Sequence, residues 1–283
     1  MRRRLVILTE IISPYRIPLF NALAQRADVD LHVIFLAETD PTLRQWRIYK
    51  EEIRFSHQIL PSWRKRVGKF NVLLNRGVRR ALAAAAPQVI LCGGYSYVAS
   101  WQCLHWARAH KIPLFLWSES NAQDQRRGHA LVEFLKNKFL RKCNGFVVPG
   151  RSAREYLRAH QVEDSRIFTA PNAVANDLFA SAAAAARQNE TGLRRELALP
   201  ERYFLFVGRL VREKGVFELL SAYAKLDESL RQQVGLVFVE MKSLDSAGIT
   251  ERGRDLGGRR RKIRSGALPD PDDFKKISAI VRP

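Results

Sequence analysis

Short apolar runs alternate with longer amphipathic stretches along the N-terminal part of the chain. The short runs predict strands at Leu5–Leu8, Leu31–Leu36, Ile53–Leu60, Gln88–Cys92, Pro113–Trp117, Gly145–Val148 and Arg166–Thr169. The longer stretches predict helices at Pro14–Arg26, Val67–Ala86, Val98–Ala109, Ala130–Arg141 and Arg151–Ala159. Continuous apolar strands that alternate with helices are typical of a parallel sheet covered on both faces. The sequence therefore predicts an α/β fold with a doubly wound, Rossmann-like layer.

A second alternation begins further along the chain. Tyr203–Val207 predicts a strand, Val216–Leu226 a helix and Val234–Val239 another strand, after an alanine-rich stretch at Ser181–Arg187 and a helical piece at Thr191–Leu199. Two strands and one helix would leave the faces of a doubly wound sheet exposed, so we expect this second Rossmann-like domain to be incomplete. The predicted organisation is an N-terminal domain over residues 1–180, a linker over 181–200 and the start of the second domain over 201–240.

Residues 241–283 lack a sustained helix or strand period. Apolar residues thin out, Phe274 is the only aromatic residue there, and Arg259–Lys262 forms a run of positive charge. We expect a disordered tail, and we hypothesise that it is read in a shifted frame or joined from unrelated sequence.

The composition excludes a globally disordered chain, because 46% of the residues are hydrophobic and 10% are aromatic. No apolar run reaches the roughly 18 residues that a membrane-spanning helix needs. The run Leu5–Leu8 gives way at once to polar residues without a signal-peptide cleavage site, which favours a cytoplasmic protein. Cys92, Cys103 and Cys143 are widely spaced and fit no metal-binding pattern, so we expect reduced, packed thiols.

The formal net charge of +20 indicates partners that carry phosphate: nucleic acid, anionic lipid or a nucleotide-linked ligand. The basic residues are scattered and form no recognised nucleic-acid-binding motif, so we expect no specific nucleic acid. No GxGxxG motif follows Leu5–Leu8, which argues against a dinucleotide oxidoreductase on the same layered fold.

The segment Phe204–Val216 joins a predicted strand to a predicted helix. The strand ends at Gly208, where the absent side chain lets the backbone approach a ligand. Arg209 follows at the carboxyl edge of the sheet, where open α/β sheets bind ligands, and Lys214 lies just before a helix N-terminus, which favours anions. A guanidinium and an ammonium at these places suit a diphosphate. The alternative is that both are solvated loop charges, one of them paired with Glu213.

The same segment resembles the G-R-L-x-x-E-K-G signature of glycosyltransferase family 4. The resemblance implies a two-domain GT-B fold and transfer of a sugar from a nucleotide-diphosphate donor to a hydroxyl acceptor, with retention of the anomeric configuration. It implies that Arg209 and Lys214 hold the donor diphosphate and stabilise the departing nucleotide. It also implies that neither a tightly bound cofactor nor a metal is needed, because cationic side chains neutralise the leaving group.

The stretch Ser13–Asn21 resembles the start of one branch of this family. It follows the first predicted strand, so its tip is expected at the ligand cleft. The resemblance implies acceptor recognition or domain-closure contacts for Ser13, Tyr15 and Arg16. The alternative is a plain helix start with Pro18 in its first turn.

Two further loops follow predicted strands at the same edge. Gly93, Gly94 and Tyr95 come after one strand, where the glycines allow close approach of a ligand; a tight turn is the alternative. Glu119 comes after the next strand, and a carboxylate at this edge can orient or deprotonate an acceptor hydroxyl. Glu119 is therefore the candidate catalytic residue, with a helix cap as the alternative.

The stretch Trp63–Leu82 mixes one apolar face with many basic residues. The basic residues are Arg64, Lys65, Arg66, Lys69, Arg76, Arg79 and Arg80. A basic amphipathic helix can lie on an anionic membrane surface, each cation contributing about 1 kcal/mol. One interpretation is peripheral contact with the inner face of the cell membrane. The alternative is that the helix buries its apolar face against the sheet.

The acceptor that the family resemblance implies is a cell-envelope polysaccharide or a lipid-linked glycan. After Val239 neither the Gly-Asp-Gly-Pro-like turn nor the E-x7-E motif of the family is found, so we expect a C-terminally truncated chain. Because positioning in a closed cleft accounts for much of the rate, we expect negligible turnover. The alternatives are a non-catalytic remnant that binds an acceptor or a partner, and a basic nucleic-acid-binding protein.

Overall fold

The structure is a computed structural model that describes residues 2–40, 48, 50–67, 70–122, 130–208, 210, 212–240 and 279–281. The chain divides into two compact units. The first consists of residues 1–40 and 49–174, and the second of residues 41–48 and 175–283.

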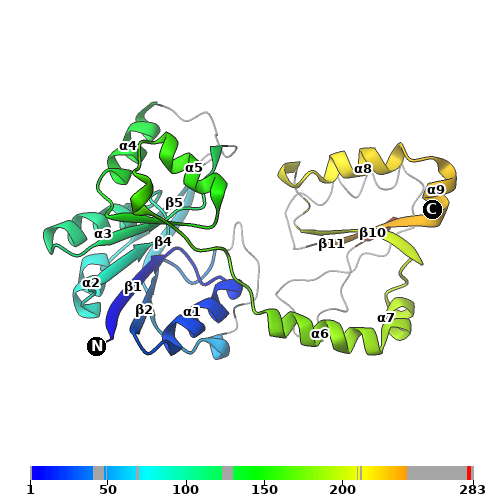
Figure 1. The fold of residues 1–283 in the computed structure, drawn as a ribbon, viewed down its shortest axis with the longest axis horizontal. Helices are drawn as coiled ribbons and strands as arrows, with labels where there is room; N and C mark the ends of the chain where they lie inside the picture. Colours follow the sequence, from blue (N-terminus) through cyan, green and yellow to red (C-terminus); the bar gives the residue numbers. More distant parts are fainter. Residues whose placement is uncertain are drawn as a thin grey trace. The chain divides into compact units, whose positions relative to one another are not determined.

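The first unit is built on a seven-stranded parallel sheet with the strand order β3-β2-β1-β6-β7-β8-β9 (Figure 1). Its strands are β1 (Arg3–Thr9), β2 (Val29–Phe35), β3 (Ser56–Ile59), β6 (Val89–Cys92), β7 (Leu114–Trp117), β8 (Gly145–Val148) and β9 (Ile167–Thr169). Its α-helices are α1 (Ile17–Gln25), α2 (Val78–Ala85), α3 (Val98–Ala109), α4 (Ala130–Leu140) and α5 (Arg151–Ala159), and its short 3-10 helices are η1 (Pro14–Arg16), η2 (Lys50–Glu52) and η4 (Asp164–Arg166). The predicted doubly wound layer is confirmed.

The direction of winding changes between β1 and β6, which are neighbours in the sheet although β2 and β3 lie between them in sequence. Val6, Ile7 and Leu8 of β1 are all buried. Because successive side chains of a strand point to opposite faces, both faces of the sheet are covered at its centre. Open sheets of this kind bind ligands at the carboxyl ends of the strands beside such a switch point.

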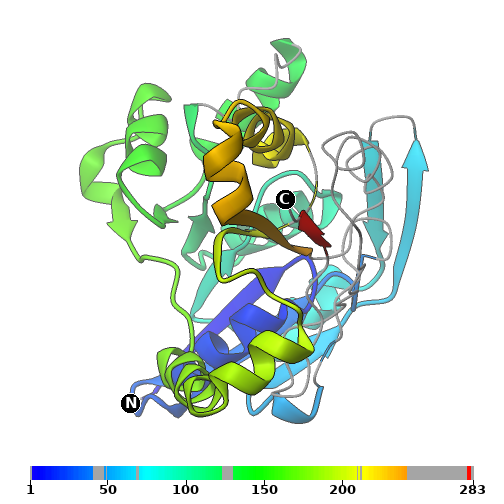
Figure 2. The same cartoon turned by 90° about the vertical axis from the view of Figure 1, so that its right-hand side faces the viewer.

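The helix predicted at Val67–Ala86 is wrong in its first half. The chain forms an antiparallel hairpin of β4 (Ser62–Val67) and β5 (Phe70–Asn75), drawn in light blue in Figure 2, and α2 begins only at Val78. Gly77, with φ +81°, ends the extended stretch and starts the helix. Of the apolar residues at helical spacing here, Val67 and Phe70 are instead cross-strand partners in the hairpin.

The second unit contains a smaller sheet. Its elements are α6 (Asn176–Gln188), α7 (Glu190–Glu196), β10 (Arg202–Gly208), η5 (Arg212–Lys214), α8 (Val216–Ala224), α9 (Glu228–Gln233), β11 (Val234–Glu240) and β12 (Ala279–Val281). β10 and β11 are parallel, and β12 pairs with β11 in the antiparallel direction. α8 lies along one face of this sheet, where Val216 and Leu220 pack with Leu236 and Phe238 (Figure 1).

The stretch over residues 181–200, which the sequence predicts as a linker, contains the end of α6 and all of α7. Alanine has the highest helix propensity, so this composition suits a helix even without an apolar pattern. Most of the tail predicted over residues 241–283 lies outside the described residues. The exception is Ala279–Val281, which forms β12.

Candidate functional site

A cavity of about 400 Å³ lies at the carboxyl edge of the first sheet. The loops after β1, β6 and β7, which are neighbours in the sheet, supply its lining. The lining residues are Arg16, Gly93, Gly94, Tyr95, Ser96, Trp117, Ser118, Glu119 and Ser120. The structure therefore brings Arg16 and Glu119 together with the Gly93–Tyr95 loop, as the position of each beyond a strand end predicts.

Arg16 is fixed from three sides. Its Nη2 donates a hydrogen bond to Oε1 of Glu119 at 2.9 Å, and its Nη1 donates to the Thr9 hydroxyl at 3.3 Å. The guanidinium carbon lies 4.4 Å from the centre of the Trp117 ring, within the range of a cation–π contact. The Arg16 side chain is 17% exposed and that of Glu119 is 48% exposed, so the pair is open to a ligand mainly on the carboxylate side.

Gly93 and Gly94 line the cavity, and the local backbone geometry also favours glycine at both positions. A Cβ added at Gly93 would lie 3.2 Å from both the Leu8 carbonyl oxygen and the Thr9 hydroxyl oxygen. Gly94 has φ +135°, a conformation that other residues rarely adopt. The absence of a side chain at Gly93 thus lets the loop pack against the end of β1; whether the glycines also allow a ligand to approach stays a prediction.

Tyr95 forms part of the cavity wall. Its ring packs against Phe139, with the centroids 6.1 Å apart, and its hydroxyl forms a hydrogen bond with Ser120. Burial raises the pKa of the Tyr95 phenol above its ordinary value, so the phenol is protonated near neutral pH. A protonated phenol can both donate and accept a hydrogen bond.

Ser13 and Tyr15 do not line this cavity. Ser13 is buried before η1, and its carbonyl oxygen accepts a hydrogen bond from the Arg16 amide at 2.8 Å. Tyr15 is 45% exposed, with its ring centre 5.9 Å from the Arg16 guanidinium. Of these two residues, the structure places Ser13 in support of Arg16 and Tyr15 beside it.

The helix-cap alternative for Glu119 does not hold for α4. That helix begins at Ala130, well beyond Glu119 in sequence. Glu119 instead accepts a hydrogen bond from Arg16, and both residues line the cavity.

The donor-side segment belongs to the second unit. Gly208 ends β10, and Arg209 lies outside the described residues. Lys214 is exposed at the end of η5, directly before Gly215, which has φ +71° and forms the N-cap of α8. An ammonium beside the unpaired amides of a helix N-terminus is a suitable arrangement for a phosphate.

Two family models match most of the chain. The model of glycosyltransferase family 4 matches residues 19–178, more than half of the chain, and the model of glycosyl transferases group 1 matches residues 190–267. The chain belongs to glycosyltransferase family 4. The second match runs past Val239, after which the sequence lacks the expected family motifs, into residues that the structure does not describe. No curated protein matches the chain.

Solved structures show the same fold at low sequence identity. HepE of Anabaena in complex with UDP and glucose has a TM-score of 0.60 and 13% identity, over 90% of this chain and 67% of HepE. The lipopolysaccharide outer core galactosyltransferase WaaB has a TM-score of 0.55 and 11% identity, over 89% of this chain and 65% of WaaB. The UDP-GlcNAc 2-epimerase from Neisseria meningitidis bound to UDP-GlcNAc has a TM-score of 0.51 and 11% identity, over 96% of this chain and 74% of the epimerase. A transferase and an epimerase thus share the GT-B fold with this family 4 chain, so the fold alone does not determine the reaction.

One cluster of charged side chains in this family 4 chain is not predicted from the sequence. Arg64 of the hairpin donates to Asp40 at 2.6 Å and to Glu10 at 3.2 Å, and the side chains of Arg64 and Asp40 are 11% and 3% exposed. The Tyr97 hydroxyl is hydrogen-bonded to Glu10, and burial together with that carboxylate raises the pKa of Tyr97. Arg64, predicted to face a membrane, instead ties the hairpin to the end of β1. The feature of the sequence that could have indicated this cluster is Glu10, an acidic residue directly after a buried strand.

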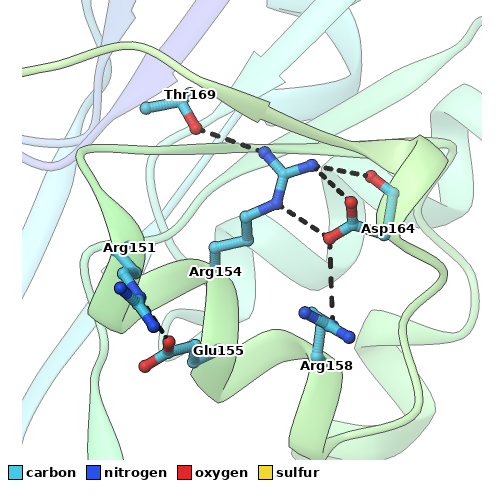
Figure 3. Close-up of polar contacts among 6 residues, drawn as sticks. All are labelled: Arg151, Arg154, Glu155, Arg158, Asp164 and Thr169. Atoms are coloured by element: carbon cyan, nitrogen blue, oxygen red, sulfur yellow. Dashed lines mark hydrogen bonds and ion pairs between the residues drawn. The ribbon is translucent and has the colours of Figure 1, made fainter.

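A smaller cavity of about 240 Å³ adjoins Glu119 on the other side, between the end of β8 and the start of α5. Figure 3 shows the ion pairs of α5: Arg151 bonds to Glu155 of the same helix at 2.7 Å, and Arg154 bonds to Asp164 of η4 at 2.7 Å. The hydrogen bond from Arg154 lowers the pKa of Asp164. These surface pairs leave the larger cavity as the better candidate site.

Cys92, Cys103 and Cys143 are buried and free, as the sequence predicts, and burial raises the pKa of each thiol. Among the described residues, no group of three or more histidine, cysteine or acidic side chains is placed to hold a metal ion. Within the same described ranges, no helix combines the length and apolar character needed to cross a membrane.

Proposed function

We propose that the chain belongs to an enzyme that transfers a sugar from a UDP-sugar to a hydroxyl acceptor, with retention of the anomeric configuration. The observation that carries this proposal is the pairing of Arg16 with Glu119 in a cavity at the switch point of a family 4 chain. The volume of this cavity, about 400 Å³, falls within the roughly 300–1,000 Å³ typical of small-molecule sites. The choice of UDP rests on similar structures that contain UDP or a UDP-sugar.

The donor is held by the segment Gly208–Gly215 in this proposal. Arg209 and Lys214 bind the diphosphate, and their charge stabilises the nucleotide as it leaves the sugar. The N-terminus of α8 adds unpaired amides directed at the same phosphates. No metal is needed for this step, since the cations of the protein supply the compensating charge.

The acceptor occupies the cavity of the first unit. Glu119 orients the attacking hydroxyl or accepts its proton, and Arg16 holds the carboxylate in place. Tyr95 supplies a further hydrogen-bonding group on the cavity wall. The cation–π contact with the Trp117 ring helps to keep Arg16 beside the carboxylate.

The acceptor class we propose is a cell-envelope polysaccharide or glycolipid, with the enzyme in the cytoplasm at the inner face of the membrane. WaaB, a lipopolysaccharide galactosyltransferase by its name, supports this choice. The surface that would contact anionic lipid is one face of the hairpin, where Trp63 and Leu74 are cross-strand partners and 54% and 41% exposed. Exposed Lys65 lies on the same face, and Arg76 follows the hairpin. Aromatic and basic residues together suit a membrane interface.

Titration of UDP into the full chain tests the donor proposal without requiring turnover, which we predict to be negligible. Lys214→Ala removes the cation beside the N-terminus of α8 and should weaken UDP binding about tenfold. Lys225→Ala is the matched control, because Lys225 is an exposed lysine at the opposite end of the same helix, and it should leave the affinity unchanged. Equal affinities for all three proteins, or no UDP binding by the unaltered chain, would contradict the proposal.

A further inference from the structure

The charge in the larger cavity is balanced. Of the described residues that line it, Arg16 and Glu119 are the two that carry a charge, and they are paired at 2.9 Å. The other lining residues are glycine, serine, tyrosine and tryptophan. The cavity is thus neutral in a chain whose formal net charge is +20.

The ion pair offers a donor and an acceptor side by side. Arg16 uses Nη2 for Glu119 and Nη1 for Thr9, and a guanidinium has five N–H donors in all. Glu119 accepts from Arg16 with Oε1, and within the described part of the chain its Oε2 has no hydrogen-bond partner. A ligand hydroxyl can donate to the carboxylate while a neighbouring hydroxyl accepts from the guanidinium.

An anionic group of a ligand finds no uncompensated positive charge in this cavity. The positive charge of Arg16 is already compensated, and Glu119 is the more exposed member of the pair. A phosphate or carboxylate that approached Arg16 would come close to the Glu119 carboxylate, and like charges at such distances repel. The surrounding hydroxyl groups and aromatic rings carry no cation that would offset this repulsion.

We propose that this cavity selects an uncharged, polyhydroxylated group of the acceptor and rejects acceptors that carry a carboxylate or phosphate at that position. Glu119 sets the selectivity by cancelling the charge of Arg16. The inference rests on the proposed function, because it specifies the class of acceptor for the same site. It predicts that neutralising Glu119 converts the cavity into a site for anions.

The test is ligand-observed NMR with the full chain and three matched pairs of sugars: the methyl glycosides of glucose, galactose and mannose, and those of the corresponding uronic acids. The unaltered chain should bind at least one neutral glycoside more tightly than its uronic acid counterpart. Glu119→Gln should shift that ratio about tenfold toward the uronic acid, since Arg16 is then uncompensated.

Glu155→Gln is the matched control. It also removes one carboxylate from an arginine–glutamate pair, drawn in Figure 3, and changes the net charge equally, but Glu155 is not among the residues that line the larger cavity. Its ratio should equal that of the unaltered chain. Arg16→Gln provides the opposite change and should lower uronic acid binding further.

The inference is overturned if the unaltered chain binds none of the six sugars, if it prefers the uronic acids, or if Glu119→Gln and Glu155→Gln shift the ratio equally. The UDP titration distinguishes this failure from failure of the proposed function. UDP binding that depends on Lys214 while sugar selectivity is absent leaves the donor proposal standing. Sugar selectivity without UDP binding would support the acceptor inference and contradict the donor proposal.

Discussion

Two arginine–carboxylate sites lie beyond the end of β1 and differ in exposure. Arg64 and Asp40 are almost fully buried, whereas the carboxylate of Glu119, paired with Arg16, is about half exposed. A buried pair is costly to break because the remaining charge has lost its solvent, while an exposed pair contributes little to stability. The comparison teaches that the same chemical pair can anchor a hairpin in one place and remain available to a ligand in the other.

The largest expected effect is on Arg64. Arg64→Ala removes the Arg64 guanidinium from its ion pair with the almost fully buried Asp40 and should lower the free energy of unfolding by about 3–5 kcal/mol. Urea denaturation of the full chain measures the change. Glu119→Ala is the control and should cost about 1 kcal/mol or less, because the carboxylate that it removes is half exposed. Similar losses for the two variants would remove the distinction between an anchoring pair and a ligand-binding pair.

A smaller effect is expected at Tyr97, whose hydroxyl bonds to Glu10 and so links the cavity loop to the buried cluster. Tyr97→Phe removes the hydroxyl and keeps the ring, and it should cost about 1 kcal/mol of stability. Thermal and urea denaturation provide the measurement. No loss at all would mean that the hydroxyl contributes nothing to holding the loop.

The smallest effect on stability is expected at Glu119. Glu119→Gln should change the free energy of unfolding by less than about 0.5 kcal/mol, because the side chain is half exposed. Denaturation beside Glu155→Gln, a surface pair of the same type, gives the reference. A loss of several kcal/mol would mean that Glu119, like Arg64, mainly stabilises the fold.

Most of the layered fold follows from local pattern. The helices predicted at Val98–Ala109 and Arg151–Ala159 have the observed bounds, and the parallel strands appear where short apolar runs predict them. The hairpin was missed because its apolar residues also fit a helical repeat, and only pairing between Trp63 and Leu74 distinguishes the two patterns. Local periodicity cannot report a cross-strand contact.

The sequence predicts the position of the cavity but not the side-chain contacts within it. Strand ends indicate the edge at which Glu119 and Arg16 lie, since parallel strands end together. The contact between them spans 103 positions in sequence, and that of Arg64 with Asp40 spans 24. Such pairings depend on how loops fold over the sheet. For this reason the sequence pattern predicts a surface position for Arg64 and indicates no role for Glu10.

The central claim is that the Arg16–Glu119 cavity holds the sugar acceptor. A crystal structure of the chain soaked with the neutral glycoside that binds most tightly tests it directly. The account predicts a sugar in that cavity, with hydroxyl groups within hydrogen-bond distance of both Arg16 and Glu119. A sugar bound elsewhere, with this cavity empty at saturating concentration, would contradict it.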